Sequence, residues 1–139
     1  MNQIKNRDSL IQNMFEAAVT AHKNAVVPYC KFPVSACVTG KGSSLYVGVN
    51  IDNKVPGQTI CAESVALGSM IAAGEDRLSH VLVIAGVSGM ERFCMPCGGC
   101  RQRLLGFSDK NTLIHTCLHD GRIMSRPLFD LIPFRKAIC

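Results

Sequence analysis

Residues 80–87 read His-Val-Leu-Val-Ile-Ala-Gly-Val, and this nearly continuous apolar run places the tightest limit on the fold. A short apolar segment without polar alternation is typical of a central strand that is covered on both faces. Apolar residues recur at helical spacing over residues 8–24, and two further helices are predicted over 61–73 and 97–106. The chain therefore predicts helices that cover both faces of one sheet.

The other strands are predicted from turn signals. Residues 32–39 and 45–50 are rich in strand-forming residues and flank a Gly-Lys-Gly turn, so they are expected to form a hairpin. Residues 112–117 form the next predicted strand, and an Asp-Gly turn at 120–121 returns the chain as a fifth, antiparallel strand. The predicted fold class is α/β, with three α/β/α layers and a mixed five-stranded sheet whose last two strands are antiparallel. Separately, the length predicts a single domain over residues 1–139.

The composition limits the possible partners. Hydrophobic residues make up 47% and charged residues 18% of the 139 positions, which is typical of a globular protein. No apolar run approaches the ~20 residues of a membrane-spanning helix, and the first residues lack the apolar core of a secretory signal. We therefore expect a cytoplasmic protein without a membrane partner. The net charge of +5 comes from scattered Lys and Arg residues, so it does not indicate a nucleic-acid partner.

Eight cysteines are many for this length, and in a reducing cytoplasm clustered cysteines favour metal binding over disulfides. Cys61 is expected at the start of one helix, and Cys97 and Cys100 at the start of the next. Their spacing of three places Cys97 and Cys100 on one helical face. If the strand at 80–87 is central, both helix starts lie at the same edge of the sheet. Three thiolates would hold Zn²⁺ and leave its fourth tetrahedral position open, as a catalytic site requires.

Glu63 follows Cys61 by two residues and can lie beside the open position without being a ligand. There it could take a proton from a water molecule whose pKa the ion lowers towards about 7. Taken alone, the Cys97-Gly-Gly-Cys100 segment fits a structural zinc knuckle or a thiol pair equally well. Together with Cys61-Ala-Glu63 and with Pro96 before the pair, it matches the signature of zinc-dependent deaminases, in which the Glu is the general acid and base.

Segments 60–63 and 96–102 resemble the signature segments of the short, homotetrameric cytidine deaminases. The resemblance extends to three further segments and so covers most of the chain: 31–36, 48–51 and 131–133. It implies a cytidine deaminase-like fold, Zn²⁺ as the cofactor, and assembly as a homotetramer. It also implies hydrolytic deamination of free cytidine or deoxycytidine to uridine or deoxyuridine, with release of ammonia, in pyrimidine salvage.

The resemblance further implies roles for single residues. Phe32 would pack against the pyrimidine, Asn50 would hydrogen-bond the ribose 3′-hydroxyl, and Ala62 would read the base through its backbone. Glu63 would pass a proton to N3 and then to the departing amino group. The carbonyl of Met95 would meet the ammonia as it leaves.

Asp52 stands where the family carries a ribose-binding Glu, so it is a further candidate sugar contact. Ser64 stands in place of an Arg, and the loop at 54–57 lacks an aromatic residue that is common there. These departures leave open a deaminase of a modified cytosine nucleoside such as blasticidin S. Two more hypotheses are deamination within RNA or DNA and a zinc domain without catalysis. The chain offers no Trp and only two Tyr for stacking bases.

The remaining cysteines and histidines receive structural interpretations. A fourth thiolate from Cys94 would close the metal site, so we expect Cys94 not to bind the ion. Arg101 is equally consistent with a site residue and with a structural ion-pair partner. Inert thiols and surface or internally satisfied histidines are expected at the other positions: Cys30, Cys37, Cys117 and Cys139; His22, His80, His115 and His119.

Overall fold

The structure is a computed structural model in which residues 2–134 are described. Its order of elements is the predicted alternation of helices and strands. Two short 3₁₀ turns, Pro56–Gln58 and Leu128–Leu131, accompany eight regular elements, which have the following bounds: α1 (Asn2–His22), β1 (Val34–Gly40), β2 (Leu45–Val49), α2 (Ala62–Ala72), β3 (Leu78–Ala85), α3 (Gly98–Leu105), β4 (Leu113–Cys117) and β5 (Ile123–Pro127).

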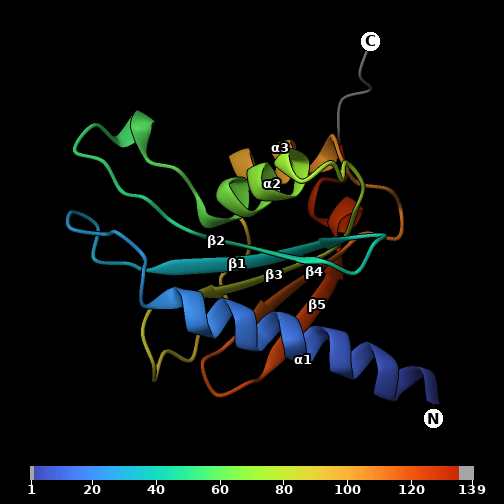
Figure 1. The fold of residues 1–139 in the computed structure, drawn as a ribbon. Coiled ribbons are helices and arrows are strands. Elements are labelled where there is room, and N and C mark those ends of the chain that lie inside the picture. Colours follow the sequence, from blue (N-terminus) through green and yellow to red (C-terminus); the bar gives the residue numbers. More distant parts are fainter. Residues whose placement is uncertain (1, 135–139) are drawn as a thin grey trace.

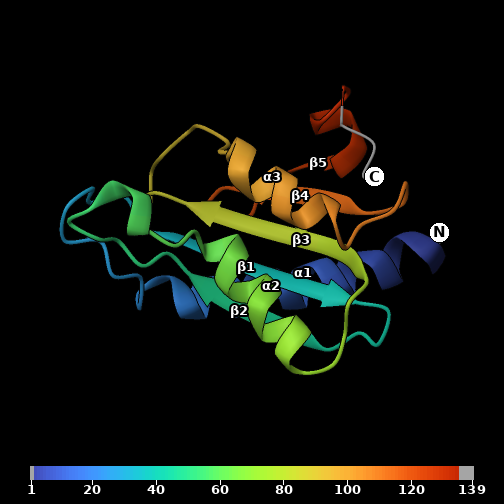
Figure 2. The ribbon, with the colours of Figure 1, turned by 90° about the horizontal axis from the view of Figure 1, so that it is seen from above.

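The five strands form one mixed sheet in the order β2-β1-β3-β4-β5. Strand β1 is antiparallel to both β2 and β3, β3 and β4 are parallel, and β4 and β5 are antiparallel. Helix α1 lies against one face of the sheet, and α2 and α3 lie side by side over the other face (Figures 1 and 2). The predicted fold class is confirmed, including the central position of the apolar strand.

The element bounds differ from the predicted ones mainly at the two ends of the chain. Helix α1 begins at Asn2 rather than near residue 8, because the six residues before Asp8 include no Gly or Pro that would end a helix. The sequence after the fifth predicted strand also predicts a short final helix over residues 127–131, and this segment is instead a 3₁₀ turn, Leu128–Leu131. These differences leave the order and layering of the elements unchanged.

Two apolar clusters, one on each face of the sheet, hold the layers together. Alternate residues of β3 divide between them: Val81 and Val83 face α2 and α3, and Leu82 and Ile84 face α1. Gly48 of β2 allows α2 to approach closely, because a Cβ there would lie 2.3 Å from the carbonyl oxygen of Ala62. This close approach seats the first turn of α2 directly on the sheet.

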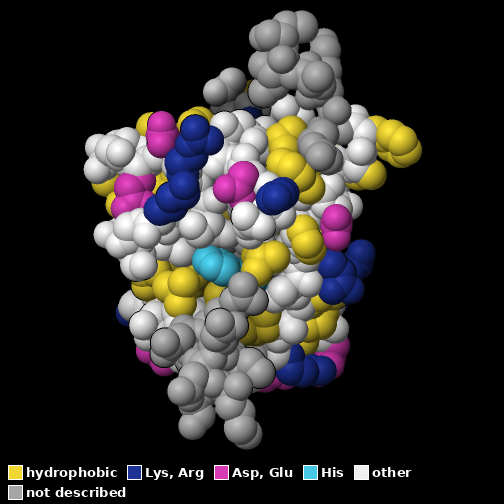
Figure 3. Space-filling model, turned by 90° about the vertical axis from the view of Figure 1, so that its right-hand side faces the viewer, with side chains coloured by type: hydrophobic (Ala, Val, Ile, Leu, Met, Phe, Trp, Pro, Cys, Tyr) yellow, Lys and Arg dark blue, Asp and Glu magenta, His cyan; other side chains and the backbone are white. Residues whose placement is uncertain are grey.

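Figure 3 shows one side of the molecular surface. On its described part, Lys and Arg side chains are interspersed with Asp and Glu rather than gathered in one band. Within the described part of the chain, no helix has the length and apolar character needed to cross a membrane.

Candidate functional site

Helices α2 and α3 each begin at a cysteine. Cys61 is the N-cap of α2 and Cys97 is the N-cap of α3, and both have extended backbone angles. The Cys100 N–H donates a hydrogen bond to the Cys97 sulfur at 3.4 Å. The first N–H groups of a helix lack partners within it and carry partial positive charge, so both helix starts favour thiolates.

The three predicted metal ligands converge. The sulfurs of Cys61, Cys97 and Cys100 all lie within 4.8 Å of one another, and the sulfurs of Cys61 and Cys97 are 3.9 Å apart. Two sulfurs bound tetrahedrally to one zinc ion at ~2.3 Å lie roughly 3.8 Å from each other. The thiol cluster, as we call these three residues, therefore fits Zn²⁺. It supplies three ligands from the described residues and leaves one tetrahedral position for another molecule.

Burial and neighbouring groups give the three thiols different pKa values. Burial raises the pKa of Cys61, and burial together with the nearby Glu63 charge raises that of Cys100. Burial also acts to raise the pKa of Cys97, but hydrogen bonds from the Cys100 N–H and the two neighbouring thiols outweigh it, so that this pKa is lowered. Cys97 is thus the thiol that most readily becomes a thiolate.

Glu63 lies in the first turn of α2, next to the thiol cluster. Its side chain is almost fully buried, at 5% exposure, and it lines the same pocket as Cys61 and Cys97. Burial raises the pKa of Glu63, although hydrogen bonds from its own N–H and from the Cys100 thiol act to lower it. The carboxyl group therefore faces the cavity beside the sulfurs and not the solvent.

A pocket of about 220 Å³ opens above this site. Four of the five predicted substrate contacts line it: Phe32, Asn50, Ala62 and Met95. Sequence reasoning missed other lining residues, namely Val34, Thr59, Val83 and Ala85. Val83 and Ala85 alternate along β3, but the unbroken apolar run gave no sign of which face each residue occupies.

Asn50 holds the segment that carries Phe32. Its side-chain Nδ2 donates to the Phe32 carbonyl at 2.9 Å, and its Oδ1 accepts from the Val34 N–H at 2.9 Å. An amide side chain has a second N–H and a second lone pair, so Asn50 retains one donor and one acceptor position. The residue can therefore position Phe32 and still bond to a ligand.

Asp52, the fifth predicted contact, is not among the residues that line the pocket. One carboxylate oxygen accepts from the N–H groups of Tyr29 and Cys30, at 3.1 and 2.8 Å, and the other accepts from the Asn53 N–H and the Thr59 hydroxyl. The hydrogen bond from the Cys30 N–H is the main reason that the pKa of Asp52 is lowered. Four accepted bonds occupy the usual capacity of a carboxylate.

Other residues have largely structural surroundings. Arg101 donates to the carbonyls of Pro96 and Leu131, at 2.8 and 3.2 Å, so it ties the loop before α3 to the last 3₁₀ turn. Cys94 lines the pocket but lies outside the thiol cluster. Cys139, predicted to be an inert thiol, lies outside the described residues.

Proteins of known type are similar to this chain in sequence and in fold. The family described as the cytidine and deoxycytidylate deaminase zinc-binding region matches residues 8–116. A cytidine deaminase from Halalkalibacterium halodurans is 33% identical over 122 residues, which are 88% of this chain and 90% of that protein. A blasticidin-S deaminase from Bacillus cereus is 25% identical over 111 residues, covering 76% of this chain and 77% of that protein.

The crystal structure of a cytidine deaminase from Burkholderia pseudomallei matches with a TM-score of 0.82 and 27% sequence identity, over 90% of this chain and 98% of that chain. The matched region of the sequence family includes Glu63 and all three members of the thiol cluster. The chain therefore belongs to the cytidine and deoxycytidylate deaminase family.

Proposed function

We propose that the chain catalyses hydrolytic deamination of free cytidine and deoxycytidine, giving uridine or deoxyuridine and ammonia. The observation that carries the proposal is that a buried carboxyl group and a three-sulfur cluster line one small pocket, next to Phe32 and Asn50. The choice of cytidine is supported by relatives that are cytidine deaminases and that match this chain over most of its length.

Cys61, Cys97 and Cys100 would hold the zinc ion. Zinc bound in such a site would act as a Lewis acid and make a water molecule a nucleophile near neutral pH. Glu63 takes the proton that this water loses and passes it to N3 of the pyrimidine while oxygen adds at C4. Glu63 then takes the second proton of the added oxygen and delivers it to the exocyclic amine, which leaves as ammonia. The carboxyl group is not consumed, and cytidine plus water becomes uridine plus ammonia.

The substrate contacts remain proposals that follow from the pocket. Phe32 packs on the face of the pyrimidine, the backbone at Ala62 reads its polar edge, and the Met95 carbonyl accepts from the amino group. Asn50 bonds to the ribose with the donor and acceptor that its contacts to Phe32 and Val34 leave over. Asp52 stays a predicted sugar contact. To bond to the sugar, its carboxylate must give up one of its four present hydrogen bonds.

We further propose a homotetramer that works in pyrimidine salvage, as the family resemblance implies, and we propose the cytoplasm as its location. A reducing compartment suits the site, because only reduced cysteines can act as thiolate ligands. Sizing at several protein concentrations tests the homotetramer. A stable monomer at all of them would contradict it without affecting the proposed reaction.

The reaction is tested by measuring ammonia release from five candidate substrates, together with the zinc content of the purified protein. We expect turnover of cytidine and deoxycytidine, with little or none of cytosine, blasticidin S or a cytosine-containing oligonucleotide. Glu63→Gln keeps the shape and removes the proton carrier, so we expect it to lower activity by about 10²–10⁴-fold or more while zinc stays bound. Turnover of blasticidin S alone would instead support a deaminase of modified nucleosides.

Glu75→Gln is the matched control, because Glu75 is a partly buried glutamate that lies outside the pocket. We expect this variant to keep wild-type activity. Full activity of Glu63→Gln would contradict the role of Glu63, and activity of zinc-free protein would contradict the metal assignment. Activity confined to the oligonucleotide would contradict the nucleoside substrate.

A further inference from the structure

Gly86 follows the last residue of β3 and begins the loop that leads to Met95 and Cys97. It is buried, and its carbonyl oxygen accepts two hydrogen bonds from histidine side chains. His22 Nε2 lies 2.7 Å from this oxygen and His119 Nε2 lies 3.0 Å from it. Two bonds use both lone pairs of a carbonyl oxygen, so the buried group is fully satisfied.

The two histidines come from distant parts of the chain. His22 is the last residue of α1, and His119 lies in the turn between β4 and β5. Their rings meet edge to face with centroids 4.8 Å apart. Because a carbonyl can only accept, both rings must carry hydrogen on Nε2. Nδ1 of a neutral His22 then accepts from the Ser35 hydroxyl at 3.0 Å, which fixes its tautomer.

The N–H and Cα of Gly86 lie next to Pro33, Met90 and Phe32, and of these Phe32 lines the pocket. The N–H of Gly86 donates to the Pro33 carbonyl at 2.7 Å. Its φ of +76° is a conformation that glycine adopts freely, and a Cβ at this position would lie 3.1 Å from the ring of Phe32 and 2.5 Å from the sulfur of Met90. Phe32 therefore rests directly against the Gly86 backbone, so a shift of this peptide displaces the aromatic ring.

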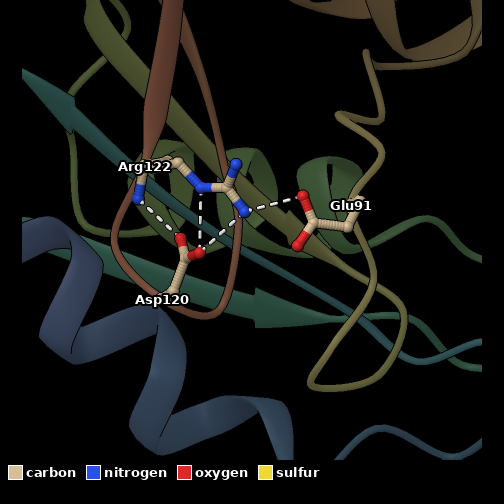
Figure 4. A network of polar contacts seen from close by, with 3 residues as sticks. All are labelled: Glu91, Asp120 and Arg122. Atoms are coloured by element: carbon tan, nitrogen blue, oxygen red, sulfur yellow. Dashed lines mark hydrogen bonds and ion pairs between the residues drawn. The ribbon is translucent and has the colours of Figure 1, made fainter.

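A second contact joins the same turn to the same loop at the surface. Arg122 pairs with Asp120 at 2.8 Å and with Glu91 at 2.9 Å (Figure 4). All three side chains are exposed, so this network contributes little compared with the buried histidine bonds. The buried contact is the one that can determine the position of the loop.

We propose that His22 and His119 are positioning residues for nucleoside binding. Together they form a clamp on the Gly86 carbonyl, here called the Gly86 clamp. It fixes the strand end against which Phe32 packs and from which the loop bearing Cys94 and Met95 departs. This inference rests on the proposed function, because it assigns to Phe32 and Met95 the role of substrate contacts. Neither histidine touches the substrate.

Kinetics of His119→Leu and His119→Gln test the Gly86 clamp. Gln can place its Nε2 donor near that of histidine, whereas Leu leaves one lone pair of the buried oxygen without a donor. A missing donor to a buried group changes an equilibrium by about tenfold. We therefore expect the KM of His119→Leu for cytidine to rise by about that factor with kcat nearly unchanged, since Glu63 and the thiol cluster are not displaced. His119→Gln should recover most of the loss.

The same pair of substitutions at His22 should give the same order of effects. His80→Gln is the control, because His80 is a partly buried histidine that bonds to His115 rather than to Gly86. We expect wild-type kinetics from this variant and wild-type zinc content in every variant. Unchanged KM in both Leu variants, or equal losses in the Gln and Leu variants, would overturn the clamp.

Nitrogen NMR of the wild-type imidazoles gives a test that needs no variant to fold. We expect both His22 and His119 to carry a hydrogen on Nε2, and the Nδ1–H tautomer at either ring would overturn the clamp. The proposed function fails separately: wild-type protein that binds zinc but does not deaminate cytidine contradicts the reaction. Active wild-type protein with indifferent clamp variants contradicts only the clamp.

Discussion

The thiol cluster and the pair His80–His115 both bring metal-ligating side chains together, on opposite faces of the same sheet. The three sulfurs point at a shared space beside a pocket. In the histidine pair, Nδ1 of His80 lies 3.0 Å from Nε2 of His115, and Nδ1 of His115 lies 2.7 Å from the Ser125 hydroxyl. Both ring nitrogens of His115 are thus already used.

Proximity of ligand-type residues therefore does not by itself make a metal site. What distinguishes the two regions is whether the lone pairs converge on unfilled space or are satisfied by each other. The Gly86 clamp belongs to the second kind, because its imidazoles direct their hydrogens at a protein carbonyl. Substitutions in the convergent groups and in the mutually satisfied groups should therefore have different effects.

Cys100→Ala and Cys117→Ala should give the largest contrast. Both cysteines are almost fully buried, but Cys100 belongs to the thiol cluster and Cys117 packs in the apolar cluster under α1. We expect Cys100→Ala to lose bound zinc and nearly all deaminase activity, since two thiolates remain. Cys117→Ala should keep both and lose only some stability. Zinc content and turnover of purified protein check this, and loss of zinc from Cys117→Ala would remove the contrast.

Acid should destabilise the histidine pair. Burial, helped by the neighbouring His80, lowers the pKa of His115 from 6.5 to about 4. Between these values the unfolded chain binds more protons than the folded one, so stability is present above pH 6.5 and is lost as the pH falls towards 4. The full shift corresponds to about 3 kcal/mol.

Urea unfolding at a series of pH values measures this loss. His115→Gln, unfolded in the same buffers, is the reference, because acid effects on the metal site are common to both proteins. We expect the wild-type free energy of unfolding to fall more steeply below pH 6.5 than that of the variant. Parallel curves would show that His115 titrates normally and that the pair is not held neutral by burial.

Gly86→Ala changes the residue whose carbonyl the two histidines hold, on the side that faces Phe32 and Met90. The positive φ at Gly86 costs about 1–2 kcal/mol for a residue with a Cβ. The added methyl group would also press on Phe32 and Met90. We therefore expect a lower melting temperature together with a raised KM for cytidine, as in His119→Leu. Gly89→Ala, at a positive φ with open space around its Cβ, should lower stability without raising KM.

Arg122→Gln should have the smallest effect. It removes two exposed ion pairs: the pair with Glu91 joins the turn between β4 and β5 to the loop after β3, as His119 does, and the pair with Asp120 lies within that turn. Exposed pairs contribute little because water and salt screen them. We expect no measurable change in KM or melting temperature. A KM as high as that of His119→Leu would mean that the surface network, rather than the histidines, holds the loop.

Much of the site could be predicted because its spacing is local. Cys97 and Cys100 are one helical turn apart, and Glu63 lies within the first turn after Cys61, so helix geometry alone sets their relative placement. The central apolar strand then places both helix starts at one sheet edge. Pocket residues such as Val83 and Ala85 could not be assigned, because an unbroken apolar run conceals which side chains share a face.

The layered α/β fold and the residues that converge as the thiol cluster beside Glu63 could be read from the sequence alone, because they depend on hydrogen-bonded geometry within a turn and on hydrophobic pattern. The folded chain was needed to show that His22 and His119 meet at Gly86, that His115 bonds to His80 and Ser125, and that the Asp52 carboxylate turns to the backbone at residues 29–30. Those contacts join segments far apart in the chain, and their partners are set by strand order, register and packing rather than by local spacing.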